Sequence, residues 1–404
     1  MQRRNTTALI GVAAIALFFF VLDPLGLFRP QSALTRPRPT AQQMSALSAT
    51  FERNAKPPRD YVVSAFDSHD IVFLGEMGQI REQVDFVAAL IPDLYRNGVR
   101  TLGLEYALSA DQAKIDRVLN APAYDEKSVE SILFDRMVLW GFKEYADIFR
   151  AAWQLNRTLP AVAPPFRIIG LNVRTEYQYL KEAGDATNPE IVKKVFAEGV
   201  PDLRMAETIE REIVATRTKA LIFTTIQHAF TRFRYKDYAE KSRKSGVAEG
   251  RSAGNIVRDR IGDRAITVLL HSPWPDAGSP GGMSYPAGGR LDAFVAENPN
   301  GESPAGLTVV GNAVGEIPVT NQSYSYGYSG LTLADMTTGY IILGPISAYH
   351  AVTPIPDFID STNVATAVQD FPGPNIDART SAADLNRFIA RMSETVGQSL
   401  ARFR

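Results

Sequence analysis

Short aliphatic runs alternate with segments of helical periodicity along most of the chain, and this alternation limits the fold more than any other feature of the sequence. Runs of four to six β-branched or aliphatic residues are typical of strands that are buried on both faces. The pattern therefore predicts an α/β fold with a mostly parallel central sheet flanked by helices. The predicted strands are 71–74, 101–104, 167–171, 220–225 and 265–270.

Helical periodicity between these runs predicts the flanking helices. The segment 82–97 places five apolar side chains on one stripe and ends at Asn97-Gly98, which is a typical helix stop. From 278 to 330 the sequence is dense in Gly, Pro, Ser and Asn, so we expect a long loop-rich insertion there. A late strand is predicted at 340–343. The other predicted helices are 125–140, 143–156, 202–216 and, at the C-terminus, 382–403.

The N-terminus carries an export or anchoring signal. A charge-free apolar run, 8–22, follows Arg3 and Arg4, and residues 25–28 could extend it toward the roughly 20 residues that span a bilayer. No small-x-small cleavage site follows the run, which favours an uncleaved anchor, and the arginine pair places the body of the protein outside the cytoplasm. We therefore expect a signal anchor or transmembrane helix over 1–28.

After the N-terminal segment, a stalk and one domain are expected. Residues 29–45 are rich in Pro, Arg, Ser and Thr, a composition that predicts an extended stalk. Residues 46–404 would then form one α/β domain that catalyses a reaction or binds a ligand. The sequence thus predicts a membrane-anchored protein on the periplasmic side of a bacterial inner membrane.

Charge and cysteine content narrow the chemistry. The chain has 43 basic and 44 acidic residues and a formal net charge of -1, so no net field would draw it to nucleic acid. It has no cysteine, which excludes disulfides, thiolate metal sites and a cysteine nucleophile. The expected partners are therefore a small-molecule ligand or substrate and, through the N-terminal helix, the membrane.

Titratable side chains follow three of the predicted strands at their carboxyl ends. Glu76, Glu105 and His228 stand there, and open α/β sheets bind their ligands at this edge. Each could also be a helix cap or a structural residue when taken alone. Two carboxylates on neighbouring strands would share a crevice and raise one pKa, as in a general acid/base pair. We therefore predict a catalytic Glu/Glu/His site, in which Glu105 and His228 could also hold a metal ion.

Other polar residues extend this predicted site. Asn172 and His271 also follow strands, and Gln79 lies in the turn after the first strand, so we assign all three to ligand binding. Arg204 and Glu207 are three residues apart and so share one helical face. They are either a surface ion pair or an Arg clamp with an additional catalytic carboxylate.

One stretch, 250–254, matches the Gly-x-Ser-x-Gly pattern of the serine-hydrolase elbow. That motif needs a buried strand running into the turn, whereas the preceding residues, 241–249, are charged and polar. We therefore interpret the match as a coincidence. Nucleotide-binding fingerprints of the phosphate-loop or paired-glycine type do not occur in the sequence.

A series of short motifs follows the order of the predicted elements between 70 and 274. In order and spacing it resembles the superfamily of erythromycin esterases, ChaN-like haem-uptake proteins and Tiki/TraB proteins. The resemblance covers about half of the chain and implies an α/β fold with a site at the strand ends. The motifs are Val72-Phe-Leu-Gly-Glu76, Leu102-Gly-Leu-Glu105, Ile169-Gly-Leu-Asn172, Arg204-Met-Ala-Glu207 and Ala220-Leu-Ile-Phe-Thr-Thr-Ile-Gln-His228-Ala229.

The chain departs from that superfamily after the first strand. The superfamily usually has a histidine soon after Gly-Glu, the proposed base of the esterases, but Gly75-Glu76-Met77-Gly78-Gln79 has none. The resemblance therefore implies a hydrolase in which His228 or a carboxylate activates water, with or without a divalent metal ion. The alternative is a non-catalytic protein that binds haem or another small ligand. Phenolate oxygens for haem could come from Tyr324, Tyr326 and Tyr328.

Overall fold

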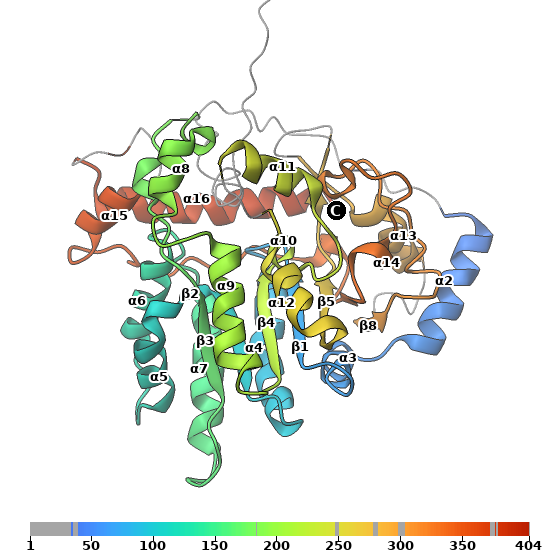
Figure 1. The fold of residues 1–404 in the computed structure, drawn as a ribbon, viewed down its shortest axis with the longest axis horizontal. Coiled ribbons are helices and arrows are strands. Elements are labelled where there is room, and N and C mark those ends of the chain that lie inside the picture. The colour runs from blue at the N-terminus through green and yellow to red at the C-terminus, as the bar shows by residue number, and fades with distance from the viewer. Residues whose placement is uncertain are drawn as a thin grey trace, which may run out of the picture.

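The structure is a computed structural model that describes residue 34 and residues 39–182, 184–246, 250–277, 282–297, 304–371, 376 and 379–403. A seven-stranded sheet with the order β3-β2-β4-β1-β5-β9-β8 forms its centre (Figure 1). All neighbouring strands of this sheet are parallel except β8 and β9. The predicted α/β class with a mostly parallel sheet is confirmed. The strands are β1 (Ile71–Glu76), β2 (Thr101–Leu108), β3 (Arg167–Asn172), β4 (Ala220–Thr225), β5 (Ala265–Leu270), β8 (Ala305–Thr308) and β9 (Gly339–Ile342).

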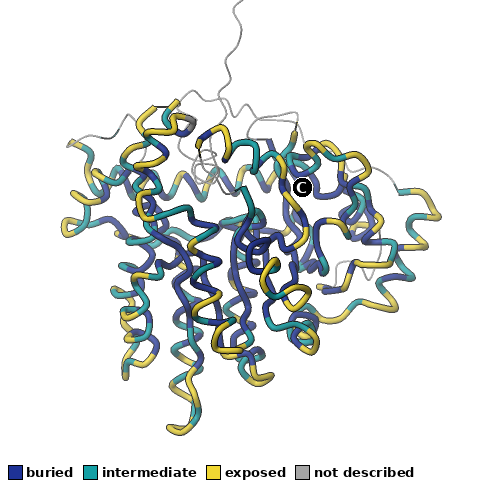
Figure 2. The backbone as a smooth tube through the Cα atoms, in the orientation of Figure 1, coloured by how far each residue is buried: buried dark blue, intermediate teal, exposed yellow. Residues whose placement is uncertain are grey.

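Helices cover both faces of the sheet. Apolar side chains of α4 (Arg81–Arg96) and α7 (Lys143–Thr158) pack with Leu74 and Leu104 on one face. Those of α9 (Pro201–Ile209) and α12 (Ala253–Ile261) pack with the opposite side chains of β1 and β4. The strands are buried along their length, while the outer sides of the helices are exposed (Figure 2). This three-layer arrangement explains the aliphatic runs in the sequence, because each strand is covered on both faces.

The remaining helices surround this layer structure. Figure 1 shows α8, α11 and α16 above the carboxyl ends of the strands, over the edge where the site was predicted. The helices are α2 (Ala41–Asn54), α3 (Pro58–Ala65), α5 (Gln112–Asn120), α6 (Glu126–Arg136), α8 (Pro189–Val195), α10 (Ile226–Ala229), α11 (Lys236–Lys244), α13 (Arg290–Glu297), α14 (Leu333–Met336), α15 (Val364–Asp370) and α16 (Ala382–Ala401).

Several boundaries differ from the sequence prediction. The helix expected over 125–140 ends at Arg136, because the chain then turns and buries Leu139 and Trp140. The helix expected over 202–216 is α9 followed by a π-helical turn, Glu210–Val214. The loop-rich region 278–330 contains α13 and β8 among its described residues, so it contributes an edge strand to the sheet.

The expected anchor, 1–28, lies outside the described residues, as does most of the expected stalk. The end of that stalk is helical, because α2 begins at Ala41. Thr40 caps this helix by accepting a hydrogen bond from the backbone N–H of Gln43, whose side chain accepts one in return. Within the part of the chain that the structure describes, no helix combines the length and the apolar character needed to cross a membrane.

Candidate active site

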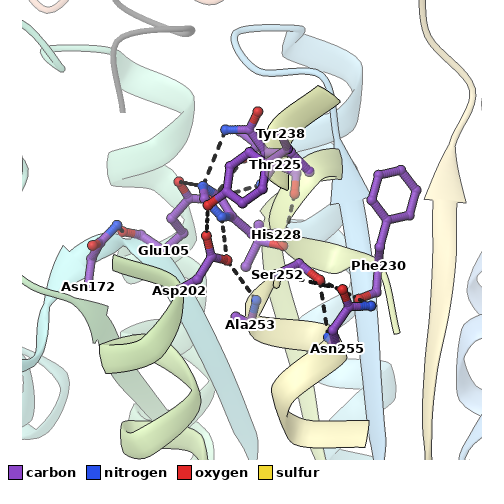
Figure 3. A network of polar contacts seen from close by, with 12 residues as sticks. Glu105, Asn172, Asp202, Thr225, His228, Phe230, Tyr238, Ser252, Ala253 and Asn255 are labelled. Atoms are coloured by element: carbon purple, nitrogen blue, oxygen red, sulfur yellow. Dashed lines mark hydrogen bonds and ion pairs between the residues drawn. The ribbon is translucent and has the colours of Figure 1, made fainter. Parts of the chain in front are cut away.

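His228 lies between two carboxylates at the carboxyl edge of the sheet (Figure 3). Its Nδ1 atom is 2.7 Å from Oδ1 of Asp202, and its Nε2 atom is 3.6 Å from Oε1 of Glu105. All three side chains are buried, with exposed fractions between 1% and 6%. Three separate elements supply them, since Glu105 is on β2, Asp202 is in the first turn of α9 and His228 is in α10 after β4. The predicted pairing of Glu105 with His228 is therefore present, and Asp202 completes it.

Asp202 is held by its own set of donors. Its Oδ1 atom also accepts a 2.6 Å hydrogen bond from the backbone N–H of Ala253, and its Oδ2 atom accepts one from the hydroxyl of Tyr238. A carboxylate fixed by several donors holds the imidazole ring beside it in one orientation. Asp202 is thus a positioning residue for His228.

The charges on both sides of His228 determine its protonation. Burial alone would lower the pKa of the imidazole, but the charges of Asp202 and Glu105 outweigh this effect and raise the pKa to about 9. At neutral pH His228 is therefore an imidazolium whose Nδ1–H donates to Asp202, while its Nε2 atom lies 3.6 Å from the carboxylate of Glu105 and 3.4 Å from the amide nitrogen of Gln227. It can supply a proton or stabilise negative charge, but it cannot accept a proton in this state.

Backbone and side-chain donors fix Glu105 on its other side. Its Oε2 atom accepts hydrogen bonds from the backbone N–H (2.8 Å) and the hydroxyl (3.3 Å) of Thr225. Its backbone carbonyl accepts hydrogen bonds from the side chains of Asn172 and Arg136, both at 3.3 Å. Asn172 is therefore next to the site, and its contact is with the backbone of Glu105. Sequence analysis did not identify Arg136, whose guanidinium lies close enough to influence the pKa of His228.

Glu76 lies on the opposite face of the sheet from Glu105. β4 separates β1 from β2, so the two glutamates are not on neighbouring strands as predicted. Glu76 follows Leu74 by two residues and, like Leu74, faces α7. On β2 it is Leu104 and Tyr106 that face α7. Because side chains alternate along a strand, Glu105 between them points to the opposite face. Period-two alternation therefore sends the two carboxylates into different networks.

Two tyrosines bind the carboxyl group of Glu76. Its Oε1 atom accepts hydrogen bonds from the hydroxyls of Tyr106 and, at 2.8 Å, Tyr145. Burial raises the pKa of Glu76 to about 8, the two hydroxyls oppose this rise, and the charge of Glu105 adds to it. Glu76 is therefore mostly a neutral acid at pH 7. The prediction that one of the two carboxyl groups has a raised pKa is supported, although burial is the main cause.

His271 belongs to a third buried network. Its Nδ1 atom contacts the Tyr340 hydroxyl at 2.9 Å, and its Nε2 atom contacts Oδ1 of Asp292 at 3.0 Å. Gln83 donates to the backbone carbonyl of His271 and accepts from the backbone N–H of Met77, so it joins the ends of β5 and β1. No hydrogen bond or ion pair among the described residues links His271 to Glu105 or His228. The structure therefore places His271, predicted to bind a ligand, in a network separate from the predicted catalytic residues Glu105 and His228.

Arg204 and Glu207 form an exposed ion pair with each other. Nη1 of Arg204 is 2.9 Å from Oε2 of Glu207, and its Nε atom donates to the backbone carbonyl of Glu198. Their side chains are 48% and 39% exposed, and within the described chain neither makes a hydrogen bond to the His228 network. The surface interpretation therefore fits better than the clamp, because Asp202, at the start of the same helix, takes the inward position.

The Gly-x-Ser-x-Gly stretch starts α12. The hydroxyl of Ser252 caps this helix by accepting from the backbone N–H of Asn255, and it donates to the backbone carbonyl of Phe230 at 2.6 Å (Figure 3). Among the described residues before Ser252, α11 and a turn at 245–246 precede it and no buried strand does. Ser252 is therefore a helix cap in this fold, and Gly254 allows α12 to approach the backbone of the β4 segment closely.

We expect Gly254→Ala to destabilise the protein by about 2–3 kcal/mol. A Cβ atom at this position would lie 2.6 Å from the backbone oxygen of Phe230 and 2.8 Å from that of Ala229, so α12 would have to move. Urea unfolding measures the loss. The matched control is Gly397→Ala in α16, where an added Cβ atom meets no atom within 4 Å and should stabilise the helix slightly. Equal stability of the two variants would contradict the close approach.

The residues predicted as cofactor ligands do not gather into one site. Among the described residues, no group of three or more His, Cys, Asp or Glu side chains is placed to hold a metal ion. Tyr324 is buried among aromatic rings, and burial raises the pKa of its phenol. The hydroxyls of Tyr326 and Tyr328 donate to Glu240 and to a backbone carbonyl. The three phenols therefore do not converge on one ligand.

Comparison with family models found no match to the chain, and comparison with curated proteins found none either. Solved structures do match. An erythromycin esterase mutant in its open conformation is 12% identical over 76% of this chain and 97% of that chain, with a TM-score of 0.45. A Bacillus cereus protein is 12% identical over 76% and 98%, with a TM-score of 0.46. The haem-binding ChaN of Campylobacter jejuni is 16% identical over 52% and 85%, with a TM-score of 0.35. An erythromycin esterase and a ChaN protein are thus among the structures that match, and at these identities the likeness is one of fold alone.

Proposed function

We propose that this protein is a hydrolase in which the Glu105 carboxylate activates water and the protonated His228 acts as the acid. The observation that carries this proposal is the position of His228, buried between Asp202 and Glu105 with both ring nitrogens facing carboxylates. An imidazolium held beside a carboxylate provides an acid and a base in one site.

The reaction would proceed at an ester or similar carbonyl group. Glu105 removes a proton from water, and the water oxygen attacks the carbonyl carbon. The imidazolium of His228 stabilises the negative charge that develops on the carbonyl oxygen. It then donates its Nε2 proton to the leaving oxygen as the carbon–oxygen bond breaks. Glu105 lies 3.6 Å from Nε2 and can return its proton to the imidazole, which restores the site.

This assignment predicts how the rate depends on pH. Activity requires protonated His228, so kcat should fall as the pH rises through about 9, the pKa of the imidazole in the folded protein. Asp202→Asn removes a negative charge that raises this pKa, so the fall should move to lower pH. A panel of carboxylic esters assayed over a pH range that brackets the pKa measures both effects.

Two outcomes would contradict the assignment. A rate that increases as His228 loses its proton would make the neutral imidazole the base and Glu105 its partner. Failure to hydrolyse any ester, together with saturable haem binding measured by a Soret band, would favour the ligand-binding alternative.

We also propose that residues 1–28 anchor the protein to a membrane with its domain on the periplasmic side. The support is the apolar, charge-free sequence of 8–22 after two arginines. The full chain should sediment with membranes, and a chain that lacks 1–28 should not. Recovery of the full chain in the soluble fraction would contradict the anchor.

A further inference from the structure

Arg136 places a positive charge beside the candidate site without an acidic partner. It is the last residue of α6 and is partly buried, and its guanidinium makes no ion pair with any Asp or Glu side chain of the described residues. His228, the other cation of the site, lies between two carboxylates. A charged group that is withdrawn from water usually has an opposite charge near it, because the loss of hydration costs free energy. The guanidinium of Arg136 therefore lacks the anionic neighbour that such a position ordinarily has.

Two hydrogen bonds hold this guanidinium in place. Its Nε atom donates to the backbone carbonyl of Glu105 at 3.3 Å, and its Nη1 atom donates to the hydroxyl of Tyr177 at 3.4 Å. Its Nη2 atom makes no hydrogen bond within the described chain, and it is not among the fully buried atoms that lack a partner. Nη2 is therefore fixed in direction but remains open to solvent, so it can donate to a bound molecule.

The reacting pair lies close to this free group and is also open to solvent. The side chains of Glu105 and His228 are 7% and 8% exposed, and the neighbouring Thr225 and Gln227 are partly exposed, as Arg136 is. The positive charge of Arg136 acts on His228, whose pKa it lowers against the effect of the two carboxylates. A substrate that reaches Glu105 and His228 from solvent therefore comes within the influence of Arg136.

The remaining donors of Arg136 select an anionic oxygen group. A guanidinium binds carboxylates through charge-assisted hydrogen bonds, which are roughly twice as strong as those between neutral groups. A carboxylate at Nη2 would supply the opposite charge that the described residues do not provide. A neutral group there would leave the cation unpaired, so it would bind less tightly.

We propose that Arg136 is a specificity-determining residue, which selects esters that carry a carboxylate close to the bond that breaks. The proposal rests on the hydrolase function proposed above, since Glu105 and His228 would act on the ester while Nη2 of Arg136 holds the carboxylate. It differs from the clamp predicted at Arg204, whose guanidinium already pairs with Glu207.

The test compares two esters of similar shape that differ in charge. Monoethyl succinate carries a carboxylate where ethyl 4-methylpentanoate carries an isopropyl group. In the wild type, kcat/KM should be at least about tenfold higher for monoethyl succinate, as expected for one hydrogen bond between charged groups. Arg136→Gln should reduce this ratio to about one. Arg136→Lys should retain part of it, because the charge remains but the planar fork of donors is lost.

The ratio of the two rates separates specificity from a structural role. If Arg136 only held the backbone of Glu105 in place, Arg136→Gln would lower kcat/KM for both esters equally, and an unchanged ratio would overturn the proposal. Arg264→Gln is the matched control, because Arg264 pairs with Asp70 at the amino edge of the same sheet, before β5 and β1 begin. This variant should keep the wild-type ratio.

Binding at Arg136 can be measured without hydrolysis. N-ethylsuccinamate is the amide counterpart of monoethyl succinate, and N-ethyl-4-methylpentanamide is its neutral analogue. In ¹⁵N–¹H spectra of the full chain, the anionic amide should shift the Nε–H signal of Arg136 saturably, with that signal assigned through Arg136→Lys. The neutral amide should bind at least about tenfold more weakly.

These measurements distinguish failure of this proposal from failure of the hydrolase function. A protein that binds the anionic amide at Arg136 but hydrolyses neither ester would lose the proposed hydrolase function and keep the anion site. Absence of any shift at Arg136, or equal binding of the two amides, would overturn the assignment of Arg136 even if both esters were hydrolysed.

Discussion

Glu105→Gln should lower kcat/KM for an ester substrate by about 10²–10⁴-fold, because it removes the base that takes the proton from water. The amide keeps the shape of the carboxylate and can still accept the hydrogen bond from the backbone N–H of Thr225. We therefore expect the fold to be preserved. The variant also removes one of the charges that raise the pKa of His228, so the residual activity should depend on a more weakly basic imidazole.

Steady-state kinetics with the best substrate of the ester panel, together with urea unfolding, separates a catalytic effect from a loss of folded protein. Glu212→Gln is the control, since Glu212 lies in the π-helical turn after α9 and forms ion pairs with Arg167 and Arg211. It should change kcat/KM by less than about twofold, because surface ion pairs contribute little. A Glu105→Gln enzyme with wild-type kcat/KM would remove Glu105 from the reaction.

Glu76→Gln should make the protein less sensitive to alkaline pH. The pKa of Glu76 is about 8 in the folded protein, whereas a glutamate exposed to water has a pKa of 4.5, so the folded protein retains a proton that the unfolded chain releases between these values. This contribution to stability is fully present below pH 4.5 and is lost as the pH rises to about 8. The difference of about 3.5 in pKa corresponds to a free energy on the order of 5 kcal/mol.

Glutamine cannot ionise, so the variant should gain stability relative to the wild type as the pH rises from about 5 to about 9. Urea unfolding at several pH values in this range measures the difference between the two proteins. His228 also loses stabilising charge interactions in part of this range, but it contributes equally to both proteins and cancels in the difference. Parallel curves for the two proteins would show that Glu76 is already ionised in the folded state at neutral pH.

The strands could be predicted because burial on both faces leaves a strong signal in the sequence. Runs such as Ala220–Thr225 have no polar alternation, and only a strand covered on both sides combines this composition with this length. The edge strand β8 was not predicted. It has four residues, Ala305–Thr308, within a stretch rich in Gly and Pro, and it is defined by antiparallel pairing with β9.

The site could be predicted only in part. Position after a strand predicted that Glu105 and His228 lie at the carboxyl edge of the sheet, and they do lie there, 3.6 Å apart. It could not show that Glu76 and Glu105 are on strands that are not neighbours, because this depends on the strand order, in which β4 separates β1 from β2. Period-two alternation within β2 was visible in the sequence and could have warned that Glu105 opposes its neighbours, Leu104 and Tyr106.

The sequence around Asp202 gives little indication that this residue contacts His228. It follows Pro201 in the first turn of a helix, where acidic residues are common because they interact favourably with the helix dipole. Its burial to 1% exposure and its contact with His228 depend on the packing of α9 against α12. Arg136 was missed for a similar reason, because it ends a helix whose mixed charge is typical of an exposed face.

His228 should be an imidazolium that the carboxylates of Asp202 and Glu105 stabilise. An NMR titration of the histidine rings, with the His228 signals assigned through His228→Asn, measures its pKa directly. We expect a pKa of about 9 that falls in Asp202→Asn and in Glu105→Gln. A pKa at or below 6.5, the ordinary value for histidine, that is the same in the wild type and in both variants would contradict it.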